Sequence, residues 1–356
     1  MRRHPFTAGL AVVVLGMVAI GAAACSDSAS MTDNIELNAP TTTISPGPGA
    51  VAVPVAVTTD ATGVMRAIVH IRVGGGPSVP VLLDTGSAGL RILPGDVGRS
   101  VQQTGQTETA TFGGGVQLTS RVVQANVSIG GLVTPSSTEI SLIQSSGCAP
   151  GFPSCAPGQG TKAIFGSSGV VGILGVAMSG GSAATVPYSP LIQLRAPYRN
   201  GFTLSLPAGG PDSLILGTPR ATADTVTVPM LPATPSVYPN GVTAWQKDVD
   251  LCWTVGISRG CGATDLDTGT SETVVIPGAV TGVTGTGVLA PGVAISVAPS
   301  SGQTLWSYTT TNTPGDGLTS VGALPGTTRF NTGIGFFTTH VVGYDAEDGR
   351  ILVTAG

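Results

Sequence analysis

Two copies of one short motif place an aspartate among residues suited to acid and base chemistry. The first copy reads Leu-Leu-Asp84-Thr-Gly-Ser and the second reads Leu-Asp267-Thr-Gly-Thr. Two carboxyl groups held close together do not both ionise readily, so they share a proton and titrate as a pair. One group then acts as a base and the other as an acid, which lets them activate a water molecule and protonate a carbonyl. The duplication predicts an active site assembled from two equivalent halves.

Strand patterns lead to both aspartates. Apolar residues alternate with polar ones in residues 67–73, and a second apolar segment, residues 79–83, follows a glycine-rich turn and ends at Asp84. Residues 109–129 have the pattern of a hairpin with a glycine-rich tip, a type of element that moves easily. Further strand patterns precede Asp267 and fill residues 341–353. Each half of the chain is therefore predicted to be rich in strands and to supply one aspartate.

The composition favours an all-β protein. The chain has 356 residues, including 53 glycines and 27 prolines, and it lacks long runs of the good helix formers. Only 10% of the residues are charged and the net charge is -4, so neither a nucleic-acid-binding surface nor a polybasic membrane surface is indicated. We expect a polypeptide or small-molecule partner and no nucleic acid.

The N-terminal segment is typical of an export signal. Arg2 and Arg3 precede an apolar stretch and a run of small residues that ends at Cys25. This resembles a bacterial lipobox, which predicts a signal peptide over residues 1–24 and a diacylglyceryl group on Cys25, with an ordinary signal peptide or a signal anchor as the alternatives. Residues 25–62 are rich in Ser, Thr, Pro and Gly and are predicted to be a flexible tether, although residues 51–57 could supply an early strand. The expected location is the outer face of the cell membrane, or the medium if the chain is simply secreted.

The other four cysteines form two close pairs. In an oxidising compartment, Cys148 with Cys155 and Cys252 with Cys261 would each close a small loop. Their spacings are looser than those of common zinc sites, and we expect neither a metal nor another cofactor.

With these features, the chain resembles the pepsin-like, bilobal aspartic proteases. Both Asp-Thr-Gly loops match, Ile173-Leu174-Gly175 is similar to the hydrophobic-hydrophobic-Gly element behind the first catalytic loop, and residues 109–129 resemble the flap over the cleft. A degenerate second copy of the hydrophobic-hydrophobic-Gly element is assigned to residues 333–335. The resemblance implies two pseudo-twofold-related β lobes with a cleft between them, the first over residues 63–205 and the second over residues 206–356.

The resemblance also implies a role for each motif residue. Asp84 and Asp267 would hold the attacking water between them. The other motif residues would support the pair. Gly86 and Gly269 would permit close backbone approach, and Thr85 and Thr268 would cross-link the loops. The hydroxyl groups of Ser87 and Thr270 would orient the carboxylates.

The flap departs from the family pattern. Phe112, followed by Gly113 and Gly114, stands where the family usually has a tyrosine, and Arg91 replaces the tryptophan that usually partners it. Losing both ends of one hydrogen bond leaves no buried donor without a partner. The change therefore concerns the positioning of the flap, and so the rate and specificity.

The predicted function is an exported, monomeric aspartic endopeptidase that acts on polypeptides and works best on the acid side of neutrality. The alternative is a catalytically inactive protein of the same fold that binds peptides or polysaccharide in its cleft. A Gly-x-Ser-x-Gly match at residues 256–260 lies between Cys252 and Cys261 with no helical pattern after it, so it predicts a surface turn rather than a nucleophile elbow.

Overall fold

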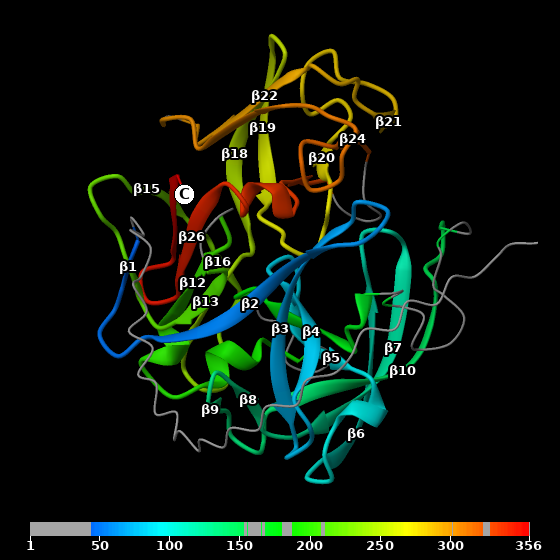
Figure 1. The fold of residues 1–356 in the computed structure, drawn as a ribbon, viewed down its shortest axis with the longest axis vertical. Coiled ribbons are helices and arrows are strands. Elements are labelled where there is room, and N and C mark those ends of the chain that lie inside the picture. Colours follow the sequence, from blue (N-terminus) through cyan, green and yellow to red (C-terminus); the bar gives the residue numbers. More distant parts are fainter. Residues whose placement is uncertain are drawn as a thin grey trace, which may run out of the picture. The chain divides into compact units, whose positions relative to one another are not determined.

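The computed structural model describes residues 44–152, 155, 165, 168–179, 187–207, 211–300, 302–322 and 328–355 (Figure 1). The predicted signal peptide, Cys25 and residues 25–43 of the predicted tether lie outside these residues. The described part of the chain forms strands and short 3-10 helices and contains no α-helix. No helix in this part has the length and hydropathy needed to cross a membrane. The all-β prediction is confirmed.

Fifteen of the described strands form one sheet, which runs β15-β27-β26-β12-β13-β2-β3-β4-β11-β5-β10-β7-β6, with β8 paired to β3 and β9 paired to β8. The strands are β2 (Val51–Thr59), β3 (Met65–Val73), β4 (Val79–Asp84), β5 (Ala88–Ile92), β6 (Gln102–Thr111), β7 (Val116–Gln124), β8 (Val127–Ile129), β9 (Leu132–Val133), β10 (Glu139–Cys148), β11 (Gly172–Val176), β12 (Gly201–Ser205), β13 (Ser213–Leu216), β15 (Val226–Pro229), β26 (His340–Asp345) and β27 (Arg350–Ala355).

Eight strands of the second half form another sheet, in the order β21-β24-β20-β25-β19-β18-β22-β23. They are β18 (Asp248–Val255), β19 (Ser258–Asp265), β20 (Thr273–Val275), β21 (Gly287–Val288), β22 (Ala294–Ala298), β23 (Trp306–Thr309), β24 (Thr319–Val321) and β25 (Phe330–Asn331). The smaller elements are β1 (Ser45–Pro46) with β14 (Pro219–Arg220), β16 (Pro232–Val237) with β17 (Thr243–Trp245), and the 3-10 helices η1 (Pro94–Asp96), η3 (Pro190–Gln193), η4 (Tyr198–Asn200) and η5 (Ile334–Phe336).

The predicted tether is shorter than the sequence suggested. Val53 and Val55 are buried, and β2 pairs with β3 on one side and with β13 on the other. Alternating valines in a Ser/Thr/Pro-rich segment supply enough apolar surface on one face to hold a strand. The prediction of a flexible segment up to residue 62 is therefore wrong from β2 onward. The pairing of β12 with β13 also crosses the lobe boundary predicted at residues 205 and 206, so the large sheet contains strands from both halves.

Each half of the chain contains the same three-stranded unit. In the first, β11 runs parallel to β4 with Gly175 opposite Asp84, and β5 runs antiparallel to β11. In the second, β25 runs parallel to β19 with Asn331 opposite Asp265, and β20 runs antiparallel to β25. This repeated arrangement brings the end of β4 and the end of β19 into equivalent positions.

The register corrects the assignment of the second hydrophobic-hydrophobic-Gly element. Because Asp267 lies two residues beyond Asp265, the position equivalent to Gly175 is Gly333, and the element is residues 331–333 rather than 333–335. Gly333 has a φ of 64°, which turns the chain out of β25, and the next residues form η5. Residues 331 and 332 are polar, so the hydrophobic-hydrophobic-Gly pattern does not identify this element in the sequence.

Buried side chains from both sheets form one large core, in which the Trp253 and Phe330 rings stack with their centroids 5.1 Å apart. A smaller cluster, which includes Leu118, Ile143 and Ile173, packs near the tip end of the β6–β7 hairpin, where Phe112 contacts it. Burial of apolar surface on this scale is the main stabilising contribution to the fold.

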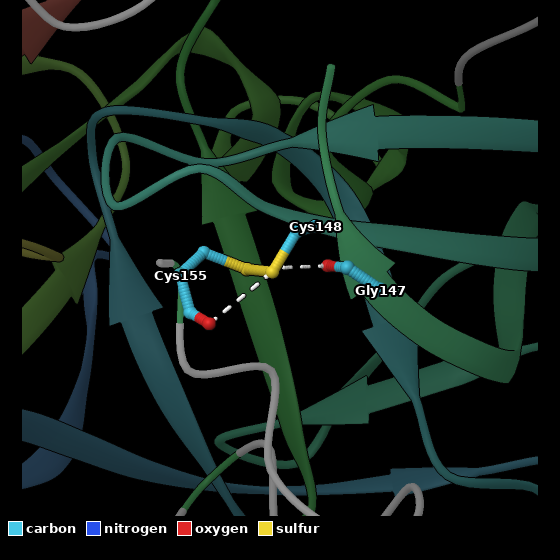
Figure 2. The surroundings of a disulfide bond; sticks show 3 residues. All are labelled: Gly147, Cys148 and Cys155. Carbon is cyan, nitrogen blue, oxygen red and sulfur yellow. Dashed lines mark hydrogen bonds between the residues drawn. A yellow bond between two sulfur atoms is a disulfide. The ribbon is translucent and has the colours of Figure 1, made fainter. Parts of the chain in front are cut away.

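Both predicted disulfides are confirmed. Cys148 is bonded to Cys155 (Figure 2) and Cys252 to Cys261. The second bond joins β18 to β19 directly across the hairpin, and the turn between these strands includes the fully exposed Ile257. The Gly-x-Ser-x-Gly match is therefore a hairpin turn on the surface, as predicted.

Candidate active site

The ends of β4 and β19 bring the two motif aspartates together at one cleft of about 470 Å³. Asp84 is the last residue of β4, and Asp267 follows β19 by two residues. Their side chains are only 5% and 7% exposed, and they are close enough to share a hydrogen bond. The structure thus forms the carboxyl pair that the repeated motif predicted.

The motif glycines allow each loop to approach the opposite aspartate. The N–H groups of Gly86 and Gly269 donate to Oδ1 of Asp84 and Asp267, at 2.8 and 2.7 Å. A Cβ atom on Gly86 would lie 2.4 Å from Asp267 Cγ, and one on Gly269 would lie 2.6 Å from Asp84 Oδ1. Both distances are shorter than van der Waals contact, so any larger residue would force the carboxyl groups apart.

The two motif threonines cross-link the loops beneath the carboxyl groups. Thr85 Oγ1 donates to the Leu266 carbonyl at 2.6 Å and accepts from the Thr268 N–H at 2.9 Å. Reciprocally, Thr268 Oγ1 donates to the Leu83 carbonyl at 2.7 Å and accepts from the Thr85 N–H at 3.1 Å. All four bonds are buried, so this symmetric network fixes one half-site against the other.

A hydroxyl group orients each carboxyl group from its outer side. Ser87 Oγ donates to Asp84 Oδ2, and Thr270 Oγ1 donates to Asp267 Oδ2 at 2.8 Å. With the glycine N–H groups on Oδ1, both oxygens of each aspartate have a donor from their own loop. Every predicted supporting residue therefore contacts the carboxyl pair or the cross-link beneath it.

The environment of the pair favours retention of one proton. Burial, and after it the negative charge of Asp267, together raise the pKa of Asp84 from 3.8 to about 7, against the opposing effect of the Ser87 hydrogen bond. Asp84 therefore carries a proton up to nearly neutral pH. A protonated carboxyl beside a second carboxyl group is the arrangement needed for combined acid and base catalysis.

The predicted flap borders this cleft. Phe112, Gly113 and Gly114, at the tip between β6 and β7, line it together with the aspartates. The disulfide-closed loop packs behind the tip, where the Ala149 N–H donates to the Gly115 carbonyl at 2.8 Å. A Cβ atom on Gly115 would lie 2.4 Å from the Phe152 ring, so this contact requires glycine.

An ion pair ties the flap to the first half of the cleft in place of the family's tyrosine and tryptophan. Arg91 Nε lies 2.9 Å from Glu108 Oε1 in β6, and the two side chains are 5% and 1% exposed. The Arg91 guanidinium also donates to the Ala88 carbonyl at 2.9 Å and lies 5.8 Å from the centre of the Phe112 ring, within cation–π range. No local sequence feature indicates Glu108, because its pairing with Arg91 depends on how the hairpin folds back.

The family model of the PE-PGRS C-terminal aspartyl peptidase-like domain matches residues 51–348. The chain belongs to this family. Its fold is also that of the crystal structure of an aspartic proteinase from Irpex lacteus, with a TM-score of 0.56 and 17% sequence identity over 86% of this chain and 97% of that one. No curated protein matches the chain significantly. The pepsin-like, bilobal fold predicted from the sequence is thereby confirmed.

In this aspartyl peptidase-like domain the two aspartates have different surroundings. Asn331 Nδ2 donates to Asp267 Oδ2 at 2.7 Å, and Asn331 Oδ1 accepts from the Gly333 N–H at 2.8 Å. The equivalent residue in the first half is Ile173, which offers no donor. Asp267 is therefore held by one more side chain than Asp84. The Asn-Thr-Gly sequence is the only local signal that could have indicated this residue.

The second half of the peptidase-like domain also places charged residues on the cleft wall. Lys247, Asp265 and Arg329 border the cleft, and Lys247 Nζ is hydrogen-bonded to Asp265 Oδ2. Burial lowers the pKa of Lys247, while the charge of Asp248, 3.6 Å from its Nζ, opposes that shift. None of these residues could be predicted from the sequence, because they are far apart in the chain and meet only through the pairing of β18, β19 and β25.

Proposed function

We propose that this chain is an exported aspartic endopeptidase that hydrolyses peptide bonds with a water molecule held between Asp84 and Asp267. The observation that carries the proposal is the complete duplicated apparatus at the cleft: two hydrogen-bonded carboxyl groups, a glycine N–H and a hydroxyl group on each, and the threonine cross-link below. Membership of an aspartyl peptidase-like family supports it.

In the proposed reaction, ionised Asp267 takes a proton from the water as its oxygen attacks the peptide carbonyl carbon. Protonated Asp84 donates its proton to the carbonyl oxygen, which gives a neutral tetrahedral diol. The amide nitrogen then receives the proton held by Asp267, the C–N bond breaks, and Asp84 recovers a proton from the diol. Neither a metal nor a covalent intermediate is needed.

The flap and the cleft shape support a polypeptide substrate. An extended peptide laid across the carboxyl pair would lie beneath the Phe112 ring, and closure of the hairpin would exclude water from the reacting carbonyl. We further propose that the chain acts as a monomer at the outer face of the cell membrane, anchored through a lipid on Cys25. Incorporation of labelled fatty acid that is lost in Cys25→Ser tests the anchor independently of catalysis.

The test of catalysis is cleavage of a mixed peptide library by the full chain in detergent, from pH 3 to pH 8, with products identified by mass spectrometry. We expect cleavage that a statine-type transition-state analogue inhibits, and a loss of about a thousandfold or more in kcat for Asp84→Asn and for Asp267→Asn. Asp250→Asn, an exposed aspartate on β18, is the matched control and should retain activity. Saturable peptide binding without products at any pH would instead establish the inactive, peptide-binding alternative.

A further inference from the structure

The two walls of the cleft can be compared position by position, because the halves share one strand arrangement. In the first half, Ile173 of β11 lies opposite Leu82 of β4. In the second half, Asn331 of β25 lies opposite Asp265 of β19. Leu82 and Ile173 are thus the structural counterparts of Asp265 and Asn331, and all four residues line the cleft.

The chemistry of the two walls differs at these positions. Leu82 and Ile173 lie beneath Phe112 of the flap, which packs against the cluster that contains Ile173, so the first wall is apolar. The second wall replaces the two aliphatic residues with a carboxylate and an amide. A substrate side chain therefore meets different surroundings on the two sides of the carboxyl pair.

A compact ionic network surrounds Asp265. Besides the bond to Lys247, Asp265 Oδ2 lies 3.8 Å from an Arg329 amino group, which is 3.0 Å from Asp248 Oδ1. The network contains two cations and two anions, so it offers no net charge to attract an ionised side chain. An apolar side chain placed against it would displace water without replacing the hydrogen bonds that water makes.

Asp265 also has unused acceptor capacity. It is 4% exposed, and among the described residues its Oδ1 atom has no hydrogen-bond partner. A buried carboxylate oxygen without a donor is unfavourable, so a donor on a bound molecule would be stabilising. The adjacent Lys247 ammonium offers donors, so the wall suits a group that both donates and accepts.

We propose that this wall, formed by Lys247, Asp265 and Arg329, is a specificity subsite for a neutral hydrogen-bonding side chain, that of Ser, Thr, Asn or Gln. The proposal rests on the peptidase function above. The preferred substrate then carries an apolar residue on one side of the scissile bond and one of these four residues on the other. A hydroxyl or carboxamide group can donate to the carboxylate and accept from a cation, which an aliphatic group of the same size cannot do.

The test compares matched peptides that differ only by Thr against Val, or Asn against Leu, at each position next to the scissile bond. On one side only, we expect the full chain to prefer the polar member by at least about tenfold in kcat/KM. The double variant Asp265→Leu with Lys247→Met removes both charges together, which avoids leaving a buried ion unpaired, and makes this wall resemble the first. It should reverse the preference.

Lys247→Gln is a milder variant that keeps Asp265 close to Arg329, and it should reduce the discrimination at least about threefold if the double variant does not fold. Leu82→Ala, on the opposite wall, is the matched control and should leave the polar preference unchanged. Cleavage with apolar residues preferred on both sides, or an unchanged polar preference in the folded charge variants, would overturn the subsite while leaving the peptidase function intact. Absence of cleavage of every peptide would instead reject the peptidase function itself.

Discussion

Replacing Asp84 with asparagine should make the protein more stable at neutral and alkaline pH while abolishing catalysis. The pKa of Asp84 rises from an ordinary value of 3.8 to about 7 because of burial and the neighbouring Asp267 charge. Between these two values the folded chain binds a proton that the unfolded chain does not, so stability falls as the pH rises. The loss is complete above pH 7.

The size of this loss follows from the pKa shift. At about 1.4 kcal/mol for each tenfold change in the proton affinity, the rise in the pKa of Asp84 from 3.8 to about 7 corresponds to about 4 kcal/mol of unfolding free energy. Asparagine stays neutral at every pH, so the variant escapes this loss. The Ser87 hydroxyl can accept from the new amide, and one oxygen remains to accept from the Gly86 N–H.

Urea unfolding of wild type and Asp84→Asn at pH 3.5 and pH 8 measures the effect. The two proteins should differ little at pH 3.5, and the variant should be more stable by up to about 4 kcal/mol at pH 8. Asp250→Asn should follow the wild type at both pH values. A difference that does not grow with pH, or a less stable variant at pH 8, would show that Asp84 is not the buried, protonated group described here.

Four further outcomes are expected. The value of kcat/KM should fall as the pH rises through about 7, because Asp84 must be protonated, and a profile that keeps rising to pH 9 would contradict this assignment. Arg91→Leu alone should cost about 3 to 5 kcal/mol of unfolding free energy because it leaves Glu108 buried without a cation, and adding Glu108→Leu should restore most of it; equal stability of the two variants would rule out the pairing. Asn331→Leu should lower kcat by about tenfold to a hundredfold with little change in KM, and an effect confined to KM would place Asn331 in substrate binding instead. Replacing Cys148 and Cys155 by serine should raise KM more than it lowers kcat, because the loop behind the flap tip loses its constraint, and unchanged kinetics would show that the loop does not position the flap.

The two Asp-Thr-Gly loops and the disulfides were predictable because their signals are local. An Asp-Thr-Gly triplet after an apolar strand specifies its own turn, and a repeated triplet indicates a repeated half-site. Cysteines seven or nine residues apart can reach each other in almost any short loop or hairpin. The alternation of apolar and polar residues in β3 was an equally local signal, and the structure buries Val69 and Ile71 and exposes Arg72.

The elements that could not be predicted depend on contacts between distant segments. Val53 and Val55 hold a strand only because β3 and β13 lie on either side of β2. The second hydrophobic-hydrophobic-Gly element was misplaced by two residues, because its identity follows from its register with β19 and not from hydrophobicity. Glu108 has no local feature that marks it as the partner of a residue in another strand.

The all-β class, the two Asp-Thr-Gly loops and the disulfide pairs follow from the sequence alone, because strand periodicity, turn chemistry and short loop closure are properties of neighbouring residues. Three features arise from the folded chain: Asn331 supports one aspartate alone, Arg91 and Glu108 secure the flap, and Lys247, Asp265 and Arg329 form a charged wall. These residues lie on separate strands, and their chemistry arises when pairing removes them from water and places them within a few ångströms of one another.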